Sequence, residues 1–171
     1  MKAELLVLRL IHIFGGIFWV GSMLFTTIFL APALRSSPAA AGQVMASLQK
    51  RRLFTVLPTV ALITIASGIR LLFIASAGFS ESYLATATGR TFSASAVAAI
   101  VAFLLALLVS RPGFVRVGRL GATLSTVTDE SERQRTTVEM QRLGRRVAIA
   151  NSIVVVLLLF AAAGMAVARY L

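Results

Sequence analysis

The stretch RLIHIFGGIFWVGSMLF, residues 9–25, decides the fold of this chain. It begins with Arg9 and contains His12, the single histidine of the protein, but is otherwise almost wholly apolar. It belongs to a run of 25 residues between Arg9 and Arg35 that holds no Asp, Glu, Lys or Arg. A helix needs about 20 predominantly apolar residues to cross a bilayer. The stretch therefore predicts a transmembrane helix that carries an ionisable side chain.

Three further apolar runs follow it, so that the predicted spans are 10–34, 53–75, 91–110 and 147–168. Of the 171 residues 58% are hydrophobic and only 13% are charged, against about 25% charged in a typical soluble domain. Spans in lipid must satisfy their backbone polar groups internally, which favours helices. We expect an all-α fold, a transmembrane four-helix bundle in which residues 1–171 form a single integral membrane domain.

The distribution of basic residues predicts the orientation in the membrane. The net charge is +11, and 12 of the 17 Lys and Arg residues lie in the two loops that follow the first and third spans. By the positive-inside rule these loops are cytoplasmic and both termini are outside. We expect a multi-pass protein of a bacterial inner membrane. The basic residues then face lipid headgroups, and the partner is the lipid bilayer and no nucleic acid.

The two cytoplasmic loops contain helix signals of their own. Ser37 followed by Pro38 is typical of a helix start, and we expect a helix from about 38 that runs into the second span. The segments 113–126 and 129–144 predict an antiparallel helical hairpin between the third and fourth spans. Asp129 with Glu132 three residues on resembles a capping box.

Charged side chains in the second of these segments are spaced for local ion pairs. Arg135 lies four residues before Glu139, and Arg142 lies three residues after it. Such spacings bring side chains together on one helix face. We interpret the charges as a solvated face, and the alternative is a surface that docks a partner.

The unusual residues of the first span share one helix face. Arg9, His12, Gly16, Trp19 and Met23 follow one another at intervals of three or four residues. An ionisable side chain within a span is costly and usually faces the bundle interior, which makes His12 the candidate site. The alternative is a structural imidazole that donates one hydrogen bond to a carbonyl of a neighbouring helix. The glycines allow a second helix or a flat cofactor to approach closely.

Met165 is predicted to lie at the depth of His12, because each is three or four residues inside an outer arginine, Arg169 and Arg9. His and Met are a known pair of axial ligands of haem iron. The arginines at the outer boundary would bind carboxylates such as haem propionates; they are Arg9, Arg70, Arg90 and Arg169. The alternative is that Met165 fills space and that the arginines reach the headgroups.

Copper is the other candidate, since it prefers soft ligands and His12, Met23 and Met165 are the intramembrane set. Signatures of catalysis are missing from the sequence. The chain has no cysteine and one histidine, and its six acids lie outside the predicted spans. We expect no catalytic residue, and binding rather than enzymatic activity.

The motif LIHIFGGIFWVGSML, with His12, Trp19 and Gly21, resembles the first helix of the copper resistance protein D family and of the related HemJ-type protoporphyrinogen oxidases. The second span, RRLFTVLPTVALITIASGIRLL, resembles theirs in its basic start and in Ser67-Gly68. The resemblance covers about the first 75 residues. It implies a four-helix membrane bundle in which His12 meets haem, a porphyrin or copper. The third span offers no second ligand, so this would be Met165 or the His12 of a second copy.

Three functions remain open at this point. The first is a protein of this resemblance that binds haem b or a metal through His12, with His12 and Met165 as the metal ligands. The second is a cofactor-free accessory subunit that packs through the glycines of the first helix against a larger membrane complex or as a homodimer. The third is copper transport.

Overall fold

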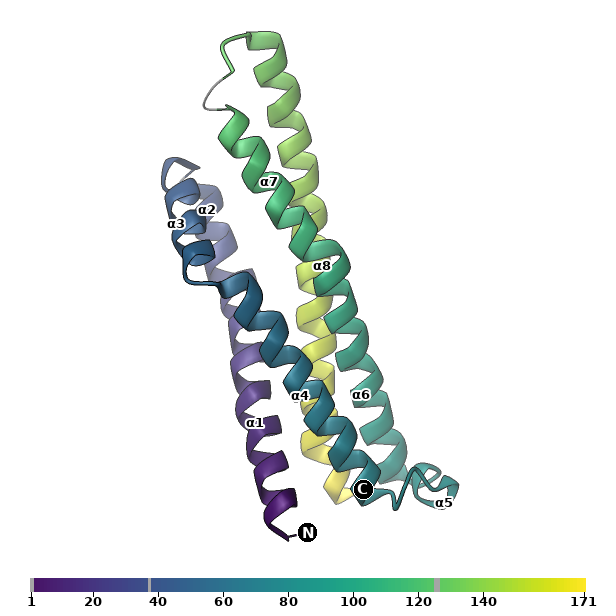
Figure 1. Cartoon of the computed structure of the whole chain (residues 1–171). Helices are drawn as coiled ribbons and strands as arrows, with labels where there is room; N and C mark the ends of the chain where they lie inside the picture. Colours follow the sequence, from purple (N-terminus) through teal and green to yellow (C-terminus); the bar gives the residue numbers. More distant parts are fainter. Residues whose placement is uncertain (1, 37, 125–126) are drawn as a thin grey trace.

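The computed structural model describes residues 2–36, 38–124 and 127–171, with the backbone only for residues 38–42. Within these ranges every regular element is helical, and four helical rods are long and apolar enough to cross a membrane. The predicted all-α fold with four membrane-length helices is confirmed. The rods run side by side, and both chain termini lie at the same end of the bundle (Figure 1).

The first rod consists of α1 (Lys2–Phe25), η1 (Thr26–Leu30) and α2 (Ala31–Ser36). After α3 (Pro38–Lys50) the chain returns as α4 (Leu53–Ala75), whose bounds are those of the second predicted span. The expected helix from 38 into this span is wrong in one respect, because it is interrupted at Arg51 and Arg52. Arg52 has a positive φ of 58°, a left-handed conformation that cannot continue a helix. The predicted cap at Ser37 lies outside the described residues.

The third rod follows the short helix α5 (Glu81–Leu84) and consists of α6 (Ala87–Leu105), η2 (Ala106–Ser110) and α7 (Arg111–Leu124). The fourth is α8 (Glu130–Val167) with η3 (Ala168–Tyr170). The predicted hairpin is therefore no separate unit. Its two helices, α7 and the first part of α8, continue the third and fourth rods beyond the other pair (Figure 1).

Two contacts define this extension. The Asp129 carboxylate accepts a hydrogen bond from the backbone N–H of Ser131 and caps α8, as the sequence predicts. The Glu139 carboxylate pairs with Arg116 of α7 at 2.6 Å. The expected pairing of Glu139 within its own helix is not what the structure shows, because packing of α7 on α8 brings a cation from the neighbouring helix closer.

Two π-helical segments, η1 and η2, interrupt the first and third rods at corresponding places. Each ends two residues before a proline, Pro32 or Pro112. Proline has no N–H to donate, and its ring clashes with the carbonyl four residues earlier. The turn before each proline widens, and Ala31 and Arg111 donate to carbonyls five residues back, those of Thr26 and Ala106.

The bundle has a small apolar core and a lipid-like exterior. The core lies at mid-height and comprises Trp19, Met23, Ala61, Ala102, Val154, Val155 and Leu158. Trp19 packs edge-on against Phe103 with ring centroids 6.4 Å apart. On the outside, Phe14 and Ile17 are 67% and 65% exposed. Large exposed apolar surfaces are unfavourable in water and suit a bilayer.

Candidate metal centre

His12 and Met165 meet near the end of the bundle that holds the termini. The His12 Nε2 atom lies 3.4 Å from the Met165 Sδ atom, and the His12 Nδ1 atom lies 2.8 Å from the backbone carbonyl oxygen of Thr64. Three of the four rods, α1, α4 and α8, thus contribute to one cluster. The predicted juxtaposition of His12 and Met165 and the inward direction of the imidazole are both seen in the structure.

The contact with Thr64 decides which imidazole nitrogen carries hydrogen. A carbonyl oxygen only accepts hydrogen bonds, so the Nδ1 atom of His12 is the donor. In the neutral ring the Nε2 atom then has a lone pair, and it faces a thioether sulfur that also carries lone pairs and no hydrogen. Two electron-pair donors therefore converge. A cation between them, either a proton on Nε2 or a soft metal ion, turns this contact into an attractive one.

The position of the ring depends on Gly68 of α4. A Cβ atom at residue 68 would lie 2.7 Å from the Cε1 atom and 3.0 Å from the Nδ1 atom of His12. One turn away, a Cβ atom at Gly15 would lie 2.3 Å from the Thr64 Oγ1 atom. Glycine at these two positions lets α1 and α4 approach closely enough for His12 to reach the Thr64 carbonyl.

The separation between His12 and Met165 discriminates between kinds of metal centre. With metal–nitrogen and metal–sulfur bonds of about 2.0 and 2.3 Å, an N···S distance of 3.4 Å gives an N–metal–S angle of roughly 105°. This fits two adjacent ligands of a tetrahedral or trigonal ion. A haem iron held between opposite axial ligands needs an N···S distance of roughly 4.3 Å on the same bond lengths. Haem with His12 and Met165 as its two axial ligands therefore does not fit this arrangement.

Other metal-binding groups do not gather here. Across residues 2–36, 38–124 and 127–171, no three His, Cys, Asp or Glu side chains lie close enough together to hold a metal ion. Met23, the third residue of the predicted copper set, lies in the apolar core 11 residues along α1, a distance of about 16 Å. The pair of His12 and Met165 is thus the candidate.

The outer arginines are not arranged as a carboxylate-binding ring. Arg70 donates to the Glu4 carboxylate through its Nε and Nη2 atoms, at 3.2 and 2.8 Å. Arg169 donates to the hydroxyl of Tyr170 and stacks over its ring. Arg9 is exposed and is not part of the cluster around His12. The predicted role of these arginines toward haem propionates has no support from their contacts.

Two further predicted site residues have structural surroundings. Trp19 is 3% exposed and packs in the core, with no contact to the His12 ring among those described. A Cβ atom at Gly16 would lie 3.9 Å from the Thr64 Cγ2 atom, an ordinary packing distance. Both residues build the interface of α1 with its neighbours.

The sequence prediction missed Thr64, whose carbonyl orients the imidazole, and gave Gly68 no part in the site. Thr64 was inconspicuous because a single threonine in a span usually bonds its own helix, and the Thr64 hydroxyl does so with the Val60 carbonyl. A signal existed in the spacing. Thr64, Ser67 and Gly68 lie three and four residues apart, which places them on one face of α4.

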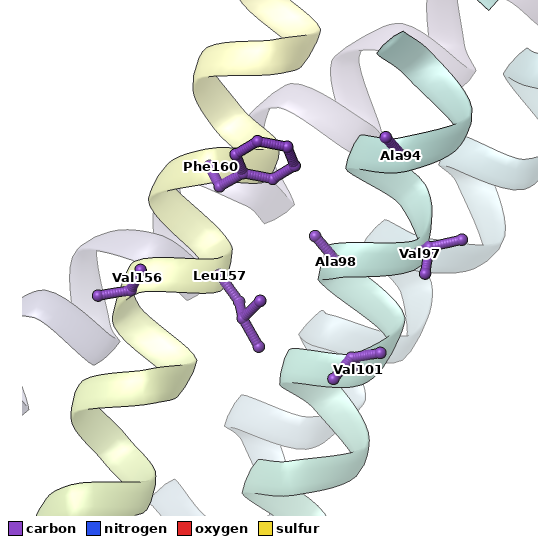
Figure 2. Close-up of a pocket in the computed structure, with 7 residues that line it drawn as sticks. All are labelled: Ala94, Val97, Ala98, Val101, Val156, Leu157 and Phe160. Atoms are coloured by element: carbon purple, nitrogen blue, oxygen red, sulfur yellow. The ribbon is translucent and has the colours of Figure 1, made fainter. Parts of the chain in front are cut away.

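A groove between α6 and α8 faces outward in the middle of the bundle and is lined only by apolar side chains (Figure 2). Ala94 and Ala98 of α6 form its floor on one side, and Leu157 and Phe160 of α8 border it on the other. It offers no group for chemistry and suits an acyl chain.

No family model, curated protein or solved structure matches this chain. The resemblance to the copper resistance protein D and HemJ-type families stays a prediction from the motif around His12.

Proposed function

We propose that this chain is a membrane-embedded metal-binding protein that holds one soft ion, Cu(I) by preference, between His12 and Met165. The observation that carries the proposal is the convergence of the Nε2 and Sδ atoms at 3.4 Å while the Nδ1 atom donates to the Thr64 carbonyl. Thioether and imidazole donors together select Cu(I) over harder ions. An angle of roughly 105° leaves coordination positions open to a ligand from outside the chain.

The packing below the pair supports binding rather than transport. On the inner side of His12, the rods close on Trp19, Met23, Val154 and Leu158, each no more than 6% exposed. No polar side chain belongs to this core cluster within the described residues. An ion released from the pair toward the inner side would have to cross apolar side chains, at a large desolvation cost. We therefore propose that the ion enters and leaves at the end that holds the termini.

A cofactor-free accessory subunit is the second candidate. It is favoured by the bond between His12 and Thr64, which a structural histidine would also make. Its packing face cannot include Gly15, because α4 already occupies the space beside that residue.

Titration of the metal-free protein with Cu(I), in competition with a chromophoric chelator, separates the two candidates. The proposal predicts one Cu(I) per chain, and at least tenfold weaker binding in both His12→Ala and Met165→Leu. Met23→Leu is the matched control, because it removes a buried thioether outside the pair. Equal affinity in the Met165→Leu and Met23→Leu variants, or no binding by the wild type, would refute the metal site.

A further inference from the structure

Three polar side-chain oxygens are buried in the inner half of the bundle: Thr27 Oγ1, Ser110 Oγ and Asn151 Oδ1. Within residues 2–36, 38–124 and 127–171 they have no hydrogen-bond partner. Ser110 and Asn151 are 5% and 3% exposed. A buried oxygen without a partner is costly, and native proteins usually satisfy such groups with ordered water or a ligand.

The two hydroxyls differ from the other hydroxyls of the spans. Thr59, Thr64 and Ser95 each donate to the carbonyl four residues earlier in their own helix. Thr27 lies in η1 and Ser110 in η2, the two π-helical segments. Because a π-helical turn is wider than an α-helical turn, the carbonyl that normally receives the hydroxyl is displaced. Pro32 and Pro112 thus leave both hydroxyls available for another partner.

All three oxygens lie at one level of the bundle. His12 contacts Met165, and α1 and α8 are antiparallel, so 15 residues further along α1 and 15 back along α8 Thr27 comes level with Ala150. Gly113 of α7 packs against Val147, so three residues back and three forward Ser110 also comes level with Ala150. Asn151 is the next residue of α8. The level lies about 22 Å from that of His12.

We propose that Thr27, Ser110 and Asn151 form a water-accessible polar site that opens to the inner end of the bundle and binds water or another small neutral hydrogen-bonding molecule. Hydroxyls donate and accept, and the Oδ1 atom of asparagine accepts, so the set suits a neutral ligand with both functions. A cation is disfavoured by the charges nearby. Arg111 follows Ser110 directly, and all six acids of the chain are at least 12 residues from these three positions.

The site is separate from the His12 pair. The apolar core with Trp19, Val154 and Leu158 lies between the two levels. On its other side the polar site is close to the inner end, since Asn151 follows Arg146 by five residues, about 7.5 Å of helix. Water therefore reaches it from the side of the basic loops.

Cysteine accessibility tests the proposal cleanly, because the chain has no cysteine of its own. Single variants of the full chain in lipid nanodiscs are exposed to a charged methanethiosulfonate, which reacts with thiols in contact with water, and modification is followed by mass spectrometry. We expect Ser110→Cys to react at least tenfold faster than Ala102→Cys, which is buried in the apolar core at 0% exposure. Thr27→Cys serves as a second variant if Ser110→Cys fails to fold.

Two controls make the result decisive. Ser131→Cys on the exposed part of α8 reports that the reagent is active, and Ser152→Cys places a thiol beside Asn151 but on the exposed, lipid-facing side. Fast modification at 110 or 27 with slow modification at 152 supports the site. The proposal is overturned if residues 110 and 27 react no faster than Ala102→Cys, or if Ser152→Cys reacts as fast as they do, since depth alone would then explain the reactivity.

Discussion

The imidazole of His12 touches the thioether of Met165 across 153 residues of sequence, with 3.4 Å between the Nε2 and Sδ atoms. The contact depends on two opposite helix directions, because α1 begins and α8 ends at the same end of the bundle. The Thr64 carbonyl fixes the ring so that its second nitrogen faces the sulfur.

Replacing Gly68 with alanine is expected to weaken Cu(I) binding by 10- to 100-fold, a range typical of groups that position a ligand. The new methyl group would lie 2.7 Å from the imidazole and force the ring away from Thr64. Chelator competition measures the change. Gly21→Ala is the matched control on α1, because a Cβ atom there has no described atom within 4 Å and should leave the affinity unchanged.

Truncation of Trp19 to alanine should destabilise the bundle by on the order of 3 kcal/mol, because it leaves a cavity beside Phe103 in the core. The neighbouring Phe18 is 45% exposed, so Phe18→Ala should cost far less. Denaturant unfolding in detergent followed by circular dichroism gives both values. Equal losses would mean that the core is wrongly placed.

The ion pair of Arg70 and Glu4 is expected to contribute little. Its side chains are 49% and 43% exposed, and pairs of this kind contribute about 0.2–1 kcal/mol. Glu4→Gln should therefore lower the free energy of unfolding by less than about 1 kcal/mol. A loss of several kcal/mol would instead indicate that Arg70 is buried in the membrane-embedded protein.

The excess of basic residues in two loops predicts that both termini face outside. A phosphatase that is active only outside the cytoplasm should be active when fused after Leu171 and inactive when inserted at Thr128. The reverse pattern of activities would invert the proposed orientation, and with it the side from which a metal ion reaches His12.

The helical spans were predictable because length and apolarity alone define them, and the bounds of α4 coincide with the predicted 53–75. The level of Met165 with His12 was also predictable, since both were measured from the ends of antiparallel helices. Rotation about the helix axis was not. Arg9 shares a sequence stripe with His12 yet is exposed, because a residue at the end of a rod extends beyond its neighbours.

The role of Thr64 was hidden for a different reason. Its contribution to the site is a backbone carbonyl, which every residue possesses, and only the packing of α1 on α4 selects one of them. The π-helical segments were equally hidden. Pro32 and Pro112 indicated a disturbance of each rod, but its form as a widened turn that frees Thr27 and Ser110 depends on the neighbouring helices.

X-ray absorption of the copper-loaded protein tests the central claim most directly. The account predicts a Cu(I) spectrum with one nitrogen at about 2.0 Å and one sulfur at about 2.3 Å, and loss of the sulfur in Met165→Leu but not in Met23→Leu. A wild-type spectrum without sulfur, or one that Met165→Leu leaves unchanged, would contradict it.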